Sequence, residues 1–329
     1  MKKDVVLIVD SISPKTEELS RRHISDKAEV VFANSDPAVI GQHLEKAKVL
    51  VTSTKGISTE TLSKAKNCIY IQKYGAGVNN IDISQASSRN IPVGNVPATN
   101  SRSVAEYTLT LLLAVYKQII KAHNELVTNG KWLKTVLRDN NHELTGKTVG
   151  LIGLGNIGKH LRRLLVGFDC HVLYYDTFRL SPEQERDLDV EFREVEDLLA
   201  ASDVVSLHCP LTEETRHLID GHRISSMKTG AVLLNCARGG VVDENALYEA
   251  LKSGKLLGAG IDTYENEPIN NTHPFCRLSN VVLSPHNGGG TVEAIEAVVK
   301  KASENINSML LHGSVTHRDH IVNIDHIQF

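Results

Sequence analysis

The chain has 329 residues, a length at which about two compact domains are expected. Hydrophobic residues make up 41% and charged residues 23%, and the net charge is −3, so we expect a globular protein without a broad basic surface for nucleic acid or anionic membranes. The five cysteines are scattered without a CxxC pair, which argues against a zinc knuckle or a disulfide framework, and no metal site is expected.

The first hundred residues alternate short apolar runs with helix-like segments. Strands are predicted at Val5–Asp10, Val49–Ser53 and Ile69–Gly75, and a helix at Pro37–Ala47. This alternation favours a parallel sheet. Because Asp10 interrupts the first apolar run, that run predicts a strand and not a signal peptide. No run approaches the roughly 18 apolar residues of a membrane span, so a cytoplasmic location is expected.

A long helix pattern at Asn100–Gly130 leads into a second alternating block. Ser103 precedes Glu106 by three residues, which predicts a capping box at the start of this helix. From Gly146 onward, near-continuous apolar runs predict six strands of a parallel sheet covered on both faces. These runs are Lys147–Gly155, Asp169–Asp176, Asp203–Pro210, Ala231–Gly240, Leu257–Tyr264 and Asn280–His286. A final helix pattern starts at Thr291.

Three glycines after the first strand of this block fit the pattern G-x-G-x-x-G. They predict a tight turn at Gly153, close backbone approach of a pyrophosphate at Gly155, and close helix–strand packing at Gly158. Asp176 follows 18 residues after the last glycine, at the end of the next strand. Its carboxylate can accept hydrogen bonds from a ribose and would repel a 2′-phosphate, which favours NAD over NADP. Arg179 is close enough in sequence to offset that repulsion.

Three chemically complementary side chains follow later strands of the same block. Arg238, Glu267 and His286 lie at or just past carboxyl ends of strands, where doubly wound sheets bind ligands. A neutral His286 is a natural general base, and its imidazolium is the corresponding acid. Glu267 can hydrogen-bond the other ring nitrogen, and Arg238 can bind a carboxylate through two hydrogen bonds.

Together these motifs resemble the D-isomer-specific 2-hydroxyacid dehydrogenase family over essentially the whole chain. The segments that carry the resemblance are Lys73–Asp82, Asn100–Leu109, Gly150–Gly158, Asn235–Leu247, Gly258–Pro268 and Ser284–Thr291. The resemblance implies an α/β fold with two doubly wound parallel-sheet domains. In it, a Rossmann NAD-binding domain at residues 101–289 is inserted into a flavodoxin-like substrate-binding domain formed by residues 1–100 and 290–329. The implied reaction interconverts a D-2-hydroxy acid and its 2-keto acid, with His286 as acid/base.

The resemblance also implies roles for further residues. Asp262 is similar to the residue that holds the nicotinamide carboxamide, and backbone N–H groups after the third strand are expected to bind the substrate carboxylate. The implied cofactor-binding residues, besides the three glycines and Asp176, are Asn156, Ile157, Cys209, Cys236, Ala237, Asp262 and Gly288. The implied substrate-binding residues are Lys73, Tyr74, Gly75, Ala76, Gly77 and Arg238.

The sequence leaves the substrate open. A basic residue at Lys73 is common in 3-phosphoglycerate dehydrogenases, but Val51–Thr54 lacks the arginine usual in a comparable segment, and Arg102 is a possible substitute. The other alternative is an NAD-sensing corepressor-like binding protein, which would keep the same three side chains. Formate dehydrogenases replace the acidic member, so Glu267 argues against that activity.

The resemblance also implies a homodimer, because in the family the segment that corresponds to Asn124–Lys147 packs around the other subunit. The segment Asn124–Lys147 is polar and irregular, yet it carries Trp132, Leu133, Val136 and Leu137. Apolar side chains on such a connecting arm indicate burial against a partner.

Overall fold

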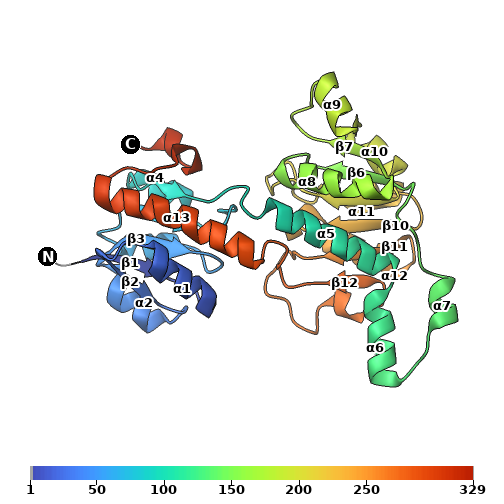
Figure 1. Cartoon of the computed structure of the whole chain (residues 1–329), viewed down its shortest axis with the longest axis horizontal. Helices are drawn as coiled ribbons and strands as arrows, with labels where there is room; N and C mark the ends of the chain where they lie inside the picture. Colours follow the sequence, from blue (N-terminus) through green and yellow to red (C-terminus); the bar gives the residue numbers. More distant parts are fainter. Residues whose placement is uncertain (1–2, 329) are drawn as a thin grey trace. The chain divides into compact units, whose positions relative to one another are not determined.

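The computed structural model describes residues 3–328 and forms two compact units. Unit 1 runs up to Asn100 and resumes at Gly290, and unit 2 consists of Ser101–Gly289 (Figure 1). The chain therefore crosses between the units twice. None of the helices in residues 3–328 is long and apolar enough to cross a lipid bilayer.

Unit 1 contains a sheet of five parallel strands in the order β2-β1-β3-β4-β5, the flavodoxin-like order. The strands are β1 (Asp4–Ile8), β2 (Ala28–Phe32), β3 (Ala47–Thr52), β4 (Tyr70–Lys73) and β5 (Val93–Gly94). The apolar-run analysis missed β2 and β5. Both are edge strands: β2 is largely only half-buried, and β5 has two residues, too few to show a pattern.

Helices cover both faces of this sheet. One face packs against α1 (Pro14–His23) and α13 (Val292–His312). The other packs against α2 (Pro37–Leu44), α3 (Thr59–Lys64) and α4 (Ile83–Ser88). The predicted final helix is confirmed, because Thr291 caps α13 by accepting a hydrogen bond from the Ala294 amide. After α13 the chain continues through two short 3-10 turns, η4 (Arg318–His320) and η5 (Ile324–His326).

Unit 2 contains a sheet of seven parallel strands in the order β12-β11-β10-β9-β6-β7-β8, the Rossmann order with one added strand. The strands are β6 (Thr148–Ile152), β7 (His171–Tyr175), β8 (Glu191–Phe192), β9 (Val204–Leu207), β10 (Ala231–Asn235), β11 (Leu256–Ile261) and β12 (Val281–Leu283). All six predicted strands are present, and β8 was missed because it has only two residues. Two doubly wound parallel sheets confirm the predicted fold class.

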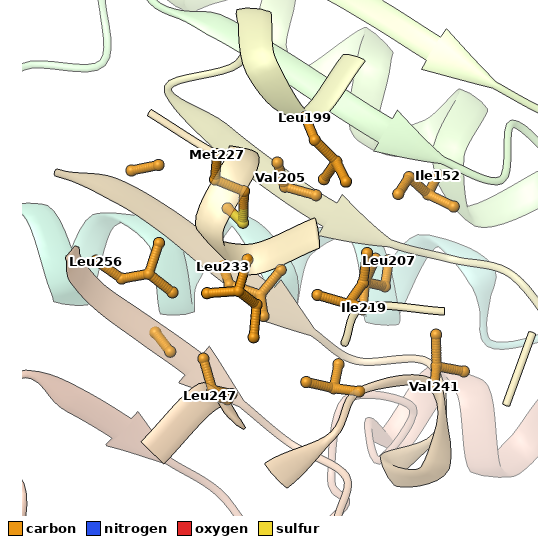
Figure 2. Close-up of a cluster of buried hydrophobic side chains, with 14 of the residues drawn as sticks. Ile152, Leu199, Val205, Leu207, Ile219, Met227, Leu233, Val241, Leu247 and Leu256 are labelled. Atoms are coloured by element: carbon orange, nitrogen blue, oxygen red, sulfur yellow. The ribbon is translucent and has the colours of Figure 1, made fainter. Parts of the chain in front are cut away.

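The core of unit 2 lies on both faces of its sheet. On one face, strand side chains meet α10 (Val195–Ala201), α11 (Gly221–Ser226) and α12 (Glu244–Lys252). Figure 2 shows Val205, Leu233 and Leu256 from the strands among Leu199 and Leu247 from the helices. The other face packs against α5 (Ser101–Tyr116) and α8 (Asn156–Leu165). Helix α9 (Pro182–Leu188) is joined to β7 by the Tyr174 hydroxyl, which donates to Glu185 Oε1 at 2.9 Å.

Two details of the predicted long helix are wrong. The helix is broken after α5, because Gln118 adopts a left-handed conformation with φ 47°, and α6 (Ile119–Asn129) and α7 (Lys134–Arg138) follow. Figure 1 shows α6 and α7 leading away from the sheet of unit 2. The capping box is absent because Ser103 lies inside α5. Its hydroxyl instead donates a hydrogen bond of 2.8 Å to the Gly288 carbonyl, a tertiary contact, and does not accept one from a helix amide.

Candidate active site

The glycine turn between β6 and α8 is built by two positions that exclude any side chain. Gly153 has φ +97°, and a Cβ there would lie 2.7 Å from the His208 carbonyl carbon. A Cβ at Gly158 would lie 2.5 Å from the Gly153 carbonyl oxygen. A Cβ at Gly155 would meet nothing within 4 Å, which leaves open space beside the backbone. Gly153 thus forms the tight turn and Gly158 the close packing, and the open space beside Gly155 is where the predicted pyrophosphate would approach.

The start of α8 presents free backbone donors to that open space. Gly155 occupies the N-cap position, and no side chain caps the helix. Within residues 3–328, the amides of Gly155, Asn156, Ile157 and Gly158 donate no hydrogen bond to protein. Free N–H groups and the positive end of the helix dipole attract an anion. The geometry therefore fits a dinucleotide pyrophosphate.

Asp176 lies at the end of β7, beside the glycine turn. Its carboxylate accepts hydrogen bonds from the Leu154 amide at 2.7 Å and from the Phe178 amide at 3.1 Å, and it remains partly exposed. The Arg179 side chain is engaged elsewhere: its Nε lies 3.2 Å from Glu185 Oε1, and its guanidinium lies 4.5 Å from the centre of the Phe192 ring. A ligand near Asp176 therefore meets a carboxylate without a free guanidinium, which favours a ribose hydroxyl over a 2′-phosphate.

The turn after β10 positions Arg238. The Asn235 side chain accepts a hydrogen bond from the Ala237 amide at 3.1 Å and donates one to the Arg238 carbonyl at 3.0 Å. Cys236 and Ala237 are buried in this turn, and Arg238 is half-buried. Burial lowers the pKa of the Arg238 guanidinium, and the charge of Glu267 raises it. A guanidinium keeps its positive charge under both influences, so Arg238 is a permanent cation for a carboxylate or keto oxygen.

Gly239 brings this turn against the segment that carries Glu267. A Cβ at Gly239 would lie 1.9 Å from the Tyr264 carbonyl carbon, so only glycine permits the contact. Gly239 was not singled out from the sequence. Its signal is its place as the first residue of a glycine pair, directly after the arginine of the run "NCARGG".

Glu267 and His286 form a direct pair. His286 Nδ1 lies 2.7 Å from Glu267 Oε2, and the other carboxylate oxygen accepts a hydrogen bond from the Tyr264 amide at 3.0 Å. Burial alone would raise the pKa of the Glu267 carboxyl, but the two hydrogen bonds and the charges of His286 and Arg238 lower it below its ordinary value. Within the described residues His286 Nε2 makes no hydrogen bond, and the ring is 45% exposed. One ring nitrogen is thus oriented and the other is free to exchange a proton.

Asp262 fixes the turn that carries His286. Its side chain is fully buried, with Oδ1 accepting from Ser284 Oγ at 2.6 Å and from the Asn287 amide at 2.8 Å. Its Oδ2 accepts from the Gly288 amide at 2.8 Å. This structural part of Asp262 could not be predicted from the sequence, because three donors clustered between residues 284 and 288 form no recognisable pattern.

His208, at the end of β9, is a further residue that sequence analysis missed. Its backbone packs against Gly153, and its Nε2 lies 2.9 Å from Ser206 Oγ. Its Nδ1 is buried and has no hydrogen-bond partner in the described residues. Burial lowers the pKa of His208 to about 4. The neighbouring Cys209 is half-buried and also borders the glycine turn, where its amide nitrogen would lie 2.9 Å from a Cβ at Gly153.

In unit 1, the loop after β4 offers three free amides. Gly75 has φ +144°, a conformation that favours glycine. The amides of Gly75, Ala76 and Gly77 donate no hydrogen bond within the part of the chain that the structure describes. The three residues are half-buried or exposed. Successive free N–H groups of this kind bind carboxylates and phosphates.

Two other residues expected in this loop are engaged in the interior. The Lys73 amine donates to the Ser53 carbonyl and, at 2.8 Å, to Asn80 Oδ1. Tyr74 is buried, its hydroxyl lies 3.1 Å from Ser20 Oγ, and its amide donates to the Thr52 carbonyl at 2.8 Å. Of the predicted substrate residues in this loop, only the amides of residues 75–77 are free to bind a ligand. The side chains of Lys73 and Tyr74 instead make hydrogen bonds inside unit 1.

Comparisons with known proteins match both units. Residues 109–288 match the family model for the NAD binding domain of D-isomer specific 2-hydroxyacid dehydrogenases. A glyoxylate reductase from Thermofilum pendens is 40% identical, with 81% of this chain and 79% of the relative aligned. A hydroxypyruvate reductase from Thermotoga maritima is 37% identical over 83% of this chain and 93% of the relative.

A solved structure shows the same fold with ligands bound. The D-lactate dehydrogenase of Aquifex aeolicus, complexed with NAD and lactic acid, superposes with a TM-score of 0.83 at 25% identity, covering 95% of this chain and 99% of that one. The family match spans more than half of the chain, and the glycine turn lies within it. The chain therefore belongs to the D-isomer specific 2-hydroxyacid dehydrogenase family and is an NAD-dependent oxidoreductase of hydroxy acids.

Proposed function

We propose that His286 is the acid/base of the reaction and that Glu267 orients it. The observation that carries this proposal is the 2.7 Å contact between His286 Nδ1 and Glu267 Oε2, which leaves Nε2 free. In keto-acid reduction, Nε2 gives its proton to the keto oxygen, and in the reverse direction it takes the hydroxyl proton. Bound NAD supplies the hydride acceptor, and NADH the donor.

We further propose that Arg238 binds and polarises the substrate. Its half-buried guanidinium can donate two parallel hydrogen bonds to a carboxylate, and its charge favours the electron-rich keto oxygen of the transition state. The three free amides of residues 75–77 are proposed to bind the substrate carboxylate in unit 1. Lys73 and Tyr74 would then support the loop by their interior contacts.

The proposed cofactor site is built from several turns of unit 2. The free amides of residues 155–158 would hold the pyrophosphate, and Asp176 would accept hydrogen bonds from the adenosine ribose. Cys209, Cys236, Ala237 and Gly288 would line the bound dinucleotide, and one carboxylate oxygen of Asp262 retains acceptor capacity for the nicotinamide carboxamide.

We propose a small, unphosphorylated 2-keto acid of the glyoxylate or hydroxypyruvate type as the substrate. The segment Val51–Thr54 has no arginine. The backbone amides of Ser53 and Thr54 already donate hydrogen bonds to the Asp10 carboxylate, at 2.6 Å and 2.7 Å. A phosphate would therefore find neither a guanidinium nor free amides in this segment. The relatives named glyoxylate and hydroxypyruvate reductase support the same class.

The arm formed by α6 and α7 supports the proposal of a homodimer. Trp132 is 78% exposed, Val127 is 68% exposed, and neither α6 nor α7 contains a buried residue. Exposed apolar side chains on a protruding arm are typical of a surface that a second subunit covers. Light scattering at micromolar concentration tests the dimer, and a monomer would contradict it. The cytoplasmic location stays a prediction.

The central experiment follows NADH oxidation at 340 nm with glyoxylate, hydroxypyruvate, pyruvate and 3-phosphohydroxypyruvate. We expect turnover with one of the small unphosphorylated acids and its loss by two or more decades in His286→Gln, given the usual ~10²–10⁴-fold worth of general acid–base catalysis. NADH affinity should change little in that variant. NADH binding without turnover of any acid would favour the corepressor-like role, and a preference for the phosphorylated acid would overturn the proposed substrate class.

A further inference from the structure

A cluster of metal-ligand side chains lies in unit 1 after α13. One potential ligand atom from each of His317, Asp319 and His320 lies within 4.8 Å of the other two. The 3-10 turn η4 carries two of the three residues. In the part of the chain that the structure describes, no other group of three such side chains meets this spacing. None of the residues proposed for catalysis or for binding NAD and the substrate belongs to the cluster.

His320 is the buried anchor of this cluster. The residue is 6% exposed, and its Nδ1 is buried without a hydrogen-bond partner. Its Nε2 lies 3.8 Å from Asp319 Oδ2. Its carbonyl accepts a hydrogen bond from the Asn95 amide at 2.9 Å, which fixes the backbone beside β5. Its burial and this backbone contact make His320 the fixed member of the cluster.

His317 has the surroundings that are typical of a metal-binding histidine. Its Nε2 lies 3.1 Å from Glu304 Oε2 on α13, and its backbone amide donates to Asn305 Oδ1 at 3.1 Å. Ligand histidines commonly donate their second ring N–H to a carboxylate in this way, because the bond fixes the ring and its tautomer. The rings of His317 and His320 stack with their centres 4.8 Å apart.

We propose that His317, Asp319 and His320 bind a divalent transition-metal ion of the zinc type. Two imidazoles and one carboxylate suit zinc, cobalt, nickel or copper, whereas calcium and magnesium prefer oxygen ligands throughout. A water molecule would complete a tetrahedral site.

Closing the site requires only a modest movement. Zinc–nitrogen bonds of about 2.0–2.1 Å place neighbouring tetrahedral ligand atoms about 3.3 Å apart. Asp319 has an 83% exposed side chain, and the His317 side chain is 32% exposed, so both can rotate toward the fixed His320.

Charged side chains near the cluster act on a bound cation in opposite directions. The charge of Lys301 repels a cation, while the carboxylates of Asp319 and Glu304 attract one. The bound ion would tie the segment after α13 to that helix and to the β5 edge.

The test is a zinc chloride titration of untagged protein, stripped with a chelator and dialysed, followed by calorimetry and by thermal melting. His317→Gln and Asp319→Asn each remove one ligand and keep the buried His320 itself unchanged. His326→Gln is the matched control, because this exposed histidine lies in the same segment and outside the cluster. We expect wild type and His326→Gln to bind one zinc ion, and the two ligand variants to bind it on the order of 10–100-fold more weakly.

Melting provides a second readout, because a ligand that binds only the folded state raises the melting temperature. Zinc should raise it in wild type and His326→Gln and by clearly less in the ligand variants. The His286→Gln variant should bind zinc as wild type does, which separates this cluster from the active site. Equal affinity in wild type and both ligand variants, or no zinc binding by wild type, would overturn the proposal.

Discussion

The backbone of His286 is held by Asp262 through a hydrogen bond of 2.8 Å from the His286 amide to the Asp262 carbonyl. His286 has φ 51°, a left-handed conformation that is uncommon outside glycine, and the same aspartate binds the next two amides through its carboxylate. A sparsely populated backbone conformation persists where surrounding contacts hold it. Asp262 therefore sets the position of the His286 imidazole.

Replacement of Asp262 by asparagine should impair catalysis more than folding. The amide nitrogen of asparagine would face either the Gly288 amide or the donors of Ser284 and Asn287, so at least one buried hydrogen bond is lost at a cost of about 1–3 kcal/mol. Because the His286 turn loosens, we expect kcat to fall at least about tenfold, the equivalent of about 1.4 kcal/mol of transition-state stabilisation.

Steady-state kinetics and urea unfolding together check this expectation. Ser284→Ala is the control, since it removes one 2.6 Å bond to the carboxylate but keeps its charge and both amide contacts, and its kcat should fall less. An Asp262→Asn enzyme with normal kcat would show that these contacts do not position His286.

The Glu267 carboxylate is expected to set the pH range of keto-acid reduction. Glu267→Gln keeps the shape but removes the negative charge 2.7 Å from His286 Nδ1, so the imidazolium needed for reduction is less stabilised. The pH profile of kcat should move to lower pH. Since the pKa of Glu267 is itself lowered, its charge is present throughout the neutral range and the shift should appear there.

Glu265→Gln is a suitable control for this profile. Glu265 also pairs with a histidine, His217, at 2.9 Å, but neither residue belongs to the proposed site. Its variant should keep the wild-type profile. If Glu267→Gln also kept the wild-type profile, the two side chains would not interact during turnover.

The sequence predicts the fold and the chemistry of the site better than it predicts the supporting contacts. The glycine turn and the side chains of Glu267 and His286 are recognisable because each follows a long apolar run, and the structure pairs the last two. Two-residue strands such as β5 are too short for any periodic signal. Contacts between distant segments, such as Gly239 against Tyr264, depend on tertiary packing that no local pattern contains.

Preference for NAD over NADP should depend on Asp176. Asp176→Ala removes the charge that opposes a 2′-phosphate, so the Michaelis constant for NADH should rise and that for NADPH should fall.

Glu185→Gln tests Arg179, the residue that could offset this charge, because the substitution removes the ion pair between Arg179 Nε and Glu185 Oε1 at 3.2 Å. That variant should gain NADPH use without losing NADH use. Equal use of both cofactors by wild type would show that Arg179 already reaches the 2′-phosphate.

His208 should make the folded protein sensitive to mild acid. Burial lowers the pKa of His208 from 6.5 to about 4. Between these two pH values His208 therefore binds a proton in the unfolded chain but not in the folded chain. Stability is therefore full above pH 6.5 and is lost as pH falls toward 4. A difference of this size corresponds to about 3 kcal/mol, at 1.36 kcal/mol per pKa unit.

The measurement is the free energy of unfolding in urea at several pH values between 7 and 4, for wild type and His208→Gln. Glutamine keeps a polar group for Ser206 but does not titrate, so the variant should lose less stability than wild type as the pH falls. The difference between the two curves is the informative quantity, because it isolates the contribution of His208. His43→Gln, at a half-exposed position on α2, is the control and should parallel wild type. Parallel curves for wild type and His208→Gln would mean that His208 takes up its proton equally well in the folded and unfolded chains.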